Sequence, residues 1–372
     1  MTSIRHVWRW SRPIVPILVA LALVVSCAAP AAPTATSVPP AKPSASAVTE
    51  AAKPAAAVAE AAKPAVGAQP QSNIQKVTLI LDWFPNTNHS GLYTAVSKGF
   101  FAANGIEVDI QAPSDPSASM KLVGAGKAEL GISYQPAVQI ARTQDIPVVS
   151  IAAILQHNTA AYAVKEGKGI TRPKEFEGKK FGTSGLAQVE PTLRTFMQCD
   201  GGDLNKVEMI NIGQKLSPAL LSDQVDVISM LPAWEGIELE GRGNKLTYMP
   251  QVQYCVPDLY TLVFIAGEQT IAEKPDLVRR FLAGASQGYE YAVNNPAEVA
   301  EILIKASPEL DPNTVRKSQI VLSTQYKAEA PRWGVQTAEK WQKHIDWMVT
   351  NKLITRTVDA SKAFTNDFLP KP

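Results

Sequence analysis

Short β-forming runs alternate with helical stretches along the chain from about residue 76. A run at 77–82 precedes a helical stretch at 89–104, and an alternating apolar and charged run at 106–110 follows. The alternation continues through two more helices and two more strands, at 117–123, 130–133, 136–143 and 148–154. This order predicts a mostly parallel sheet with helices on both of its faces.

The same pattern restarts at residue 161. Four strands and two helices are expected, at 161–164, 180–183, 188–199, 207–211, 225–230 and 233–242. A strongly β-forming run at 260–266 follows. The remaining chain is predicted to be helical, at 274–294, 296–305, 313–326 and 337–351. The restart indicates a second α/β unit.

The chain is expected to cross between the two units twice, near 159–161 and 262–265. Residues 74–160 and 263–372 then form a first, discontinuous lobe, and residues 161–262 form the second. Ligands of open α/β sheets bind at the carboxyl ends of the strands. The sequence therefore predicts an α/β protein of two lobes with a hinge, whose closure buries a ligand in the cleft between the lobes.

The first 26 residues have the features of an export signal. Arg5, Arg9 and Arg12 precede an apolar run at 14–25, which is short for a transmembrane helix. The run ends in Val-Val-Ser before Cys27, which resembles a bacterial lipobox. We expect acyl chains on Cys27 to hold the protein at the extracytoplasmic face of the cell membrane. An ordinary secretory signal with a chance cysteine is the alternative.

Residues 27–73 are expected to be a disordered tether. They are dominated by Ala, Pro, Ser, Thr and Val, and they contain no Leu and no aromatic residue around which a core could form. A segment of this length allows the folded part to stand away from the membrane.

Composition and spacing argue against several other kinds of site. The net charge of +2 gives no electrostatic case for binding nucleic acid. No His or Cys spacing indicates a metal site, no Ser-His-Asp or Cys-His arrangement supports catalysis, and no cofactor is expected. Cys199 and Cys255 either form a disulfide or remain free thiols, and both possibilities stay open at this stage.

Three blocks, at 81–93, 130–136 and 234–240, resemble the NMT1/THI5-like family. They read LDWFPNTNHSGLY, LGISYQP and WEGIELE, and the similarity covers essentially the whole folded part. This family contains bacterial binding proteins for thiamine pyrimidine precursors and a eukaryotic enzyme that makes the pyrimidine. The resemblance implies a periplasmic-binding-protein type II fold. It also implies a substrate-binding lipoprotein of an ABC importer, with a membrane permease and its ATPase as partners.

The resemblance also bears on catalysis. The enzyme branch carries a lysine for pyridoxal phosphate in the second block, a histidine four residues later, and clustered cysteines further on. Ser133 and Ala137 stand at the first two places, and Cys255 is the single cysteine at the third. A Schiff base needs an amine, so we expect this chain not to be an enzyme. A sensor subunit that presents its ligand to a receptor is a more remote alternative.

Candidate ligand contacts come mainly from these blocks. Trp83 follows the first strand, where its ring can stack on a flat heteroaromatic ligand, although core packing is the alternative for each aromatic residue. His89 is expected to be structural. Glu190 follows a Ser-Gly turn and either pairs with an aminopyrimidine edge, as the resemblance implies, or complements the helix dipole. The candidate set is Asp82, Trp83, Asn86, Asn88, Tyr93, Tyr134, Ser184, Glu190, Trp234 and Tyr260.

The site blocks favour a planar, nitrogen-rich ring as the ligand. One departure from the pyrimidine binders is the triplet Leu231, Pro232 and Ala233, where those proteins carry bulky aromatic residues and an Asn. Smaller side chains there are expected to widen the cleft for a larger ring. The sequence-based preference is therefore riboflavin. The runner-up is a thiamine pyrimidine precursor, formylaminopyrimidine or hydroxymethylpyrimidine.

Overall fold

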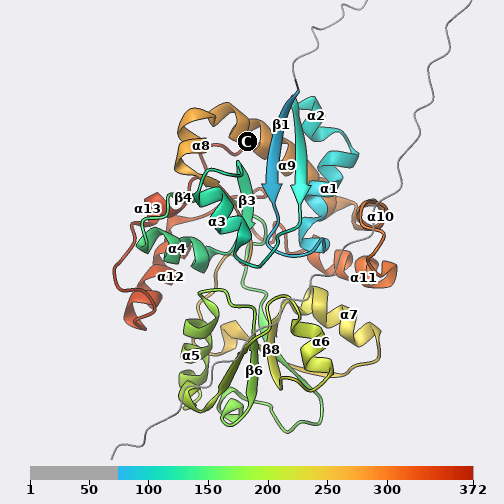
Figure 1. Cartoon of the computed structure of the whole chain (residues 1–372). Helices are drawn as coiled ribbons and strands as arrows, with labels where there is room; N and C mark the ends of the chain where they lie inside the picture. Colours follow the sequence, from blue (N-terminus) through green and yellow to red (C-terminus); the bar gives the residue numbers. More distant parts are fainter. Residues whose placement is uncertain (1–73, 372) are drawn as a thin grey trace, which may run out of the picture. The chain divides into compact units, whose positions relative to one another are not determined.

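The computed structural model describes residues 74–371, in which the strands form two five-stranded sheets (Figure 1). The predicted signal peptide, the predicted tether and Cys27 lie outside the described residues. Within residues 74–371, no helix is long and apolar enough to cross a membrane.

The first sheet has the strand order β2-β1-β3-β10-β4. Its strands are β1 (Gln75–Ile80), β2 (Ile106–Gln111), β3 (Leu130–Ser133), β4 (Val148–Ala153) and β10 (Val263–Gly267). β2, β1 and β3 are parallel, whereas β10 runs antiparallel to both β3 and β4. The last strand of the chain thus completes a sheet that four early strands begin.

Helices cover both faces of this sheet because its strands alternate apolar side chains between the faces. Leu79 and Phe264 pack beneath α1 (Ser90–Ser97), α2 (Phe100–Ala103) and α9 (Pro275–Asn294). Ile80 and Ile265 pack on the other face with α3 (Ala118–Gly124), α4 (Gln135–Thr143) and α12 (Ala338–Thr350). The remaining helices of this lobe are α8 (Glu268–Glu273), α10 (Pro296–Ala306), α11 (Pro312–Ser323) and α13 (Ala360–Ala363).

The second sheet has the order β7-β6-β8-β5-β9 and repeats the arrangement. Its strands are β5 (Ala161–Lys165), β6 (Lys180–Thr183), β7 (Glu208–Asn211), β8 (Val227–Met230) and β9 (Leu246–Pro250). β7, β6 and β8 are parallel, and β5 runs antiparallel to β8 and β9. Helix α5 (Val189–Cys199) covers one face, and α6 (Leu216–Leu221) with α7 (Ile237–Gly241) covers the other.

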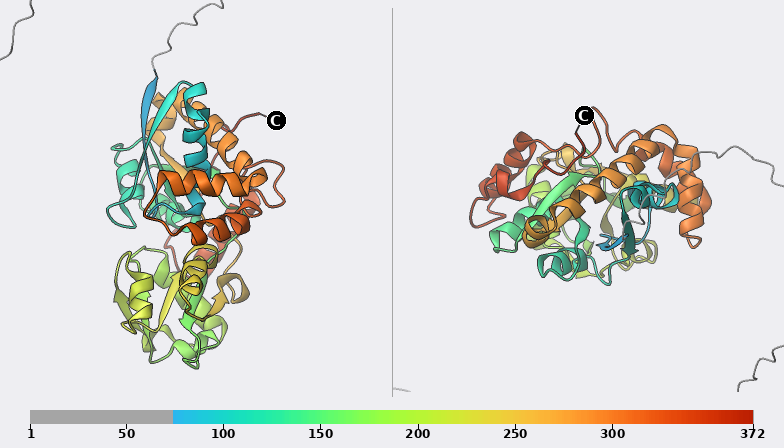
Figure 2. Two further views of the ribbon diagram at one scale, coloured as in Figure 1. Left: turned by 90° about the vertical axis from the view of Figure 1, so that its right-hand side faces the viewer. Right: turned by 90° about the horizontal axis from the view of Figure 1, so that it is seen from above.

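Short helical turns complete the architecture. They are the 3₁₀ turns η1 (Thr87–His89), η2 (Pro173–Phe176), η3 (Leu204–Lys206) and η5 (Gln251–Gln253), and the π-helical turn η4 (Pro232–Gly236). The turn η4 and helix α7 contact helix α11 of the first lobe (Figure 2). The two lobes therefore touch through these elements as well as through the chain segments that join them.

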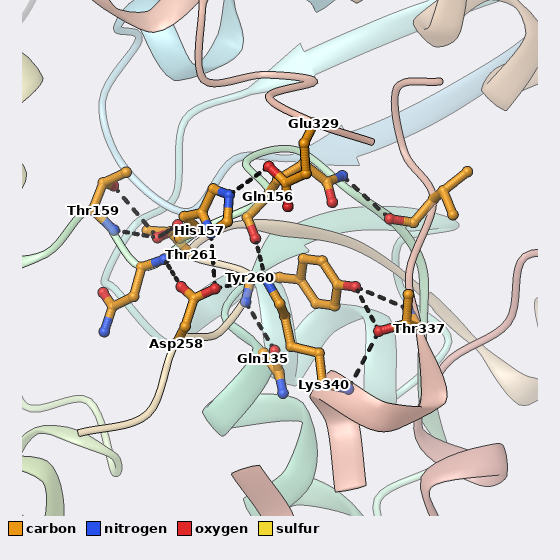
Figure 3. Close-up of polar contacts among 12 residues, drawn as sticks. Gln135, Gln156, His157, Thr159, Asp258, Tyr260, Thr261, Glu329, Thr337 and Lys340 are labelled. Carbon is orange, nitrogen blue, oxygen red and sulfur yellow. Dashed lines mark hydrogen bonds and ion pairs between the residues drawn. The ribbon is translucent and has the colours of Figure 1, made fainter. Parts of the chain in front are cut away.

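Two connecting segments join the lobes, at residues 154–160 between β4 and β5 and at 251–262 between β9 and β10. They are hydrogen-bonded to each other (Figure 3). The Thr159 backbone N–H donates to the Thr261 hydroxyl at 2.9 Å, and that hydroxyl donates to the carbonyl of His157 at 2.5 Å. This pairing holds the crossings side by side.

Several local predictions differ from the structure. The helix expected at 89–104 is divided into α1 and α2 at Gly99, whose φ of 71° ends the first helix. Helix α6 and strand β9 were not anticipated. Strand β9 pairs along the whole of β5. This pairing stabilises a strand that its own sequence pattern does not predict.

Cys199 and Cys255 form a disulfide, with their Cα atoms 5.8 Å apart. The bond joins the end of α5 to the second connecting segment. Of the two possibilities that the sequence leaves open, the structure has the paired cysteines.

Candidate ligand-binding site

A cavity lies between the two lobes, where the loops after β1, β3, β6 and β8 meet the two connecting segments. This is the carboxyl edge of the parallel strands in both sheets, where α/β proteins place their ligands. The space between the lining atoms, including the part open to solvent, is about 990 Å³. The lining is largely apolar and aromatic, with a small number of polar groups, as in pockets that bind small molecules.

Seven of the ten candidate residues line this cavity. They come from both lobes and are Asp82, Trp83, Asn86, Asn88, Tyr134, Ser184 and Trp234. A residue that binds the ligand must line the cavity, and these seven residues do. Their contact with a ligand stays a prediction.

Asp82 is the central polar group of the first-lobe wall. Its carboxylate is buried and receives two side-chain hydrogen bonds, from His89 Nε2 at 2.9 Å and from the Tyr134 hydroxyl at 2.7 Å. The fully buried His89 ring accepts the Asn86 backbone N–H at Nδ1, so its ring proton lies on Nε2 and points to Asp82. Each carboxylate oxygen thus accepts one hydrogen bond and has a further lone pair that can accept another.

The two asparagines of the same wall differ in what they offer. Asn86 is occupied by its own loop, because its side chain accepts the Asn88 N–H and donates to the Phe84 carbonyl. Asn88 Oδ1 and, on the second lobe, Gln188 Oε1 are buried acceptors without a hydrogen-bond partner among the described residues. Buried polar atoms normally have a partner, so these two are positioned for a ligand or for water.

Glu235 is the polar group of the second-lobe wall. It lies in the π-helical turn η4, and one of its carboxyl oxygens accepts the Leu231 backbone N–H at 3.0 Å. The pKa of Glu235 is raised to about 7, mainly by burial, with smaller contributions in the same direction from the nearby charges of Glu238 and Asp82. Glu235 lines the cavity, and with a pKa of about 7 its carboxyl can either donate or accept a hydrogen bond near neutral pH.

Aromatic rings complete the walls. Trp83 and Tyr134 line the first-lobe side, and Trp234 and Tyr162 line the second. Trp234 also packs against Tyr93 and the helices α10 and α11, so the same ring contributes to the cavity and to the contact between lobes. Burial raises the pKa of Tyr134 well above its usual range, which keeps its hydroxyl protonated and donating to Asp82.

The structure does not bring Glu190 to the cavity. Its side chain is 61% exposed and forms a salt bridge with Arg194, one turn further along α5. Gln188, Val189 and Thr192 face the cavity instead. Residues at positions i and i+4 share a helix face, and Glu190 lies on a different face from Gln188 and Thr192.

Tyr93 and Tyr260 also lie outside the cavity lining. Tyr93 packs in the cluster behind Trp234, where burial raises the pKa of its hydroxyl. Tyr260 is fully buried, and its hydroxyl accepts the backbone N–H of Thr337 at 2.8 Å. Its neighbours Leu259 and Thr261 line the cavity, so the alternation along an extended segment turns Tyr260 to the opposite side.

The Ser-Gly turn before α5 contains Ser184, one of the candidate residues. Ser184 does line the cavity, but the Gly185 N–H donates to the Thr183 hydroxyl at 3.1 Å. This donor is therefore used within the turn.

Sequence inspection missed several lining residues. Glu235 belongs to the third block, in which Trp234 was the candidate residue. Asn158 and Gln251 lie in the connecting segments and hydrogen-bond each other at 3.3 Å. The sequence did point to the region of Asn158, because the first crossing between the lobes was expected near 159–161.

Comparison with known families gives one match that covers most of the lobes. A family described as NMT1/THI5 like matches residues 86–299. The match contains the second and third blocks, most of the first, and all of the second lobe.

The relatives include two binding proteins and a synthase. A formylaminopyrimidine-binding protein of Halalkalibacterium halodurans is 30% identical and covers 80% of this chain and 92% of its own. A riboflavin-binding protein, RibY, of Chloroflexus aurantiacus is 25% identical, and the match covers 81% of this chain and 88% of the relative. A 4-amino-5-hydroxymethyl-2-methylpyrimidine phosphate synthase of Legionella pneumophila is 25% identical, with coverage of 79% and 92%.

Solved structures identify the fold. The alkanesulfonate-binding protein SsuA of Xanthomonas axonopodis pv. citri, bound to MOPS, superimposes with a TM-score of 0.63. It covers 80% of this chain and 99% of its own, at 13% sequence identity. The expected type II periplasmic-binding-protein fold, with two lobes, is confirmed.

Proposed function

Because this chain belongs to the NMT1/THI5-like family, we propose that it is a solute-binding protein for a flat nitrogen heterocycle that carries an amino group. Formylaminopyrimidine is the ligand that we favour. The protein would capture this ligand outside the cell and deliver it to the permease of an ABC importer.

The observation that carries the choice of ligand is the charge of the cavity wall. The two ionisable acids of the lining are Asp82 and Glu235, and no Lys, Arg or His is among the described residues that line the cavity. An acidic wall favours a ligand that brings hydrogen-bond donors or a basic nitrogen. An aminopyrimidine brings both, in its exocyclic amino group and its ring nitrogens.

The two carboxyl groups suit different atoms of such a ring. Asp82 is held by two donors and can only accept, so it suits the amino group. Glu235, with a pKa of about 7, can donate a proton to a ring nitrogen or accept from a second N–H. Stacking between Trp83 and the facing aromatic residues would hold the ring plane.

Riboflavin remains the second candidate, supported by its binding relative in Chloroflexus aurantiacus. The widened cleft that favoured it has less support. Of the triplet 231–233, Leu231 alone lines the cavity, and Ala233 instead packs in the first-lobe core with its carbonyl bonded to Ser318. The flavin edge that carries the two carbonyl oxygens would also offer Asp82 a single donor, the N3–H between them.

Calorimetry tests the choice of ligand. We expect purified full-length protein to release heat on titration with formylaminopyrimidine and to leave riboflavin fluorescence unchanged. Tight quenching of riboflavin that the pyrimidine does not reverse would establish the flavin candidate instead.

We propose binding without catalysis. Ser133, at the place where the enzyme branch has its lysine, is buried at the end of β3 and has no amine for a Schiff base. Incubation with pyridoxal phosphate should therefore give no Schiff-base absorption. A new absorption band that borohydride reduction traps on a lysine would contradict this proposal.

The membrane anchor and the permease are parts of the same proposal. We expect the change Cys27→Ser to move the protein from the membrane fraction to the soluble fraction, because the acyl chains would be lost. Neighbouring genes for a permease and an ATPase would support import, whereas a kinase or cyclase beside the gene would favour the sensor alternative.

A further inference from the structure

A cluster of four charged side chains joins the two connecting segments to the first lobe (Figure 3). His157 belongs to the first segment and Asp258 to the second, while Glu329 precedes α12 and Lys340 lies within it. The His157 ring lies between the carboxylates, with Nδ1 2.8 Å from Asp258 Oδ2 and Nε2 2.8 Å from Glu329 Oε2. Lys340 Nζ donates to Asp258 at 2.7 Å and to the Gln156 carbonyl at 2.7 Å.

The geometry fits a positively charged His157. A neutral imidazole donates from one nitrogen only, and an ionised carboxylate can only accept, so both ring contacts are hydrogen bonds only when both nitrogens carry protons. The charged groups that face the ring are Asp258, Glu329 and Lys340. Partial burial lowers the pKa of His157, but the hydrogen bonds to the two carboxylates outweigh it and raise the pKa above its usual value.

The cluster is bonded directly to residues of the ligand cavity. Asp258 Oδ1 accepts the backbone N–H of Asn158 at 2.8 Å, and the Asn158 side chain donates to Gln251 at 3.3 Å. Thr261 donates to the carbonyl of His157 itself. Asn158, Gln251 and Thr261 all line the cavity.

We propose that His157 is a pH-responsive positioning residue of the hinge. Its imidazolium clamps the two connecting segments and the loop before α12 together, and so holds Asn158, Gln251 and Thr261 in their places along the cavity. Loss of the second ring proton at higher pH turns one of the two hydrogen bonds into a contact between acceptors. The hinge then loosens and the ligand binds more weakly. The effect on ligand affinity rests on the function proposed above, whereas the clamp itself does not.

The clamp is tested first without ligand, by thermal unfolding of the full-length protein at pH 6 and pH 9. The stabilisation by His157 is complete below the ordinary histidine pKa of about 6.5 and is lost as pH rises through its raised folded-state pKa. Between pH 6 and pH 9, the melting temperature of the wild-type protein should fall by roughly 2 °C more than that of His157→Gln. Glu235 titrates in both proteins, so its contribution cancels in this difference.

Two further variants separate the clamp from a general loss of structure. Glu329 is 72% exposed, so Glu329→Gln leaves the fold intact and should remove part of the same pH-dependent difference. Glu273→Gln makes the same chemical change at an exposed site on α8 and should behave as wild type. Equal pH shifts in wild type and His157→Gln would overturn the proposal, as would a variant that is destabilised equally at both pH values.

Formylaminopyrimidine titrations at pH 6 and pH 9 test the link to the cavity. The dissociation constant of the wild type should rise about fivefold more than that of His157→Gln. If the ratio of the dissociation constants at pH 9 and pH 6 is the same in both proteins, the clamp does not position the residues of the cavity. If the pyrimidine binds at neither pH while the ligand-free difference persists, the proposed ligand is wrong and the clamp stands.

Discussion

The two walls of the cavity hold their carboxyl groups in opposite ways. On the first-lobe wall, Asp82 has both oxygens bonded, by His89 and Tyr134, and behaves as a fixed acceptor. On the second-lobe wall, Glu235 has one backbone donor, and its pKa of about 7 leaves its proton exchangeable near neutral pH. The difference teaches that two acids in one cavity can offer different hydrogen bonds when one is held by two side-chain donors and the other by a single backbone donor.

The largest effect is expected on the fixed wall. Asp82→Asn replaces a charged acceptor with an amide whose N–H₂ group faces donors, and it should weaken formylaminopyrimidine binding by about 2–4 kcal/mol in calorimetry. Asp109→Asn, an exposed site on β2, is the matched control. An unchanged dissociation constant for the Asp82 variant would show that the carboxylate of this wall does not bind the ligand.

Glu235→Gln sharpens the comparison through stability. The folded-state pKa of about 7 lies above the ordinary glutamate value of about 4.3, so the free energy of unfolding falls as pH rises from about 4.3 through 7. The glutamine variant does not titrate. It should be more stable than wild type by about 2–3 kcal/mol at pH 8, in denaturant unfolding, and similar to it at pH 4.

The same variant should bind the pyrimidine more weakly than wild type, because a glutamine amide can donate a hydrogen bond to a ring nitrogen but cannot transfer a proton to it. A gain in stability together with a loss of affinity is the pattern expected of a binding residue. A pH-independent difference in stability between the two proteins would contradict the shifted pKa.

Trp83→Ala tests whether an aromatic side chain of the first wall stacks on the ligand. We expect a loss of roughly 1–3 kcal/mol in binding. Phe84→Ala is the neighbouring control, since Phe84 is 50% exposed and is not part of the described cavity lining. Equal losses for the two variants would point to the loop as a whole instead of to stacking.

The smallest effect is expected at Glu190. Its carboxylate pairs with Arg194 in solvent, so Glu190→Gln should change the dissociation constant by less than about 0.5 kcal/mol. A large loss would mean that α5 turns toward the ligand on binding.

Much of this architecture was predictable from local patterns. Strands such as β3 and β6 were located to the residue, because each is a short β-forming run bounded by loop residues. Once parallel strands are identified, the loops after them are the natural site, which is why Asp82, Trp83 and Tyr134 were found. Strand β9 was missed because it ends in a proline and its stability comes from pairing with β5.

The candidates that lie outside the cavity lining share a common origin in side-chain direction. Glu190 and Gln188 are two residues apart on α5, and sequence distance alone does not say which of them faces the cavity. Tyr260 and Thr261 are adjacent on an extended segment and point to opposite sides. The place of Glu235 in the cavity lining depends on the π-helical turn η4, for which the sequence contains no clear signal.

The most direct test of the acidic wall compares two pyrimidines that differ at one position, with an amino group in one and a carbonyl oxygen in the other. If Asp82 accepts from the amino group, the amino compound should bind at least about 10-fold more tightly in calorimetry, and Asp82→Asn should abolish most of that preference. Equal affinities for the two compounds in wild-type protein would contradict the account.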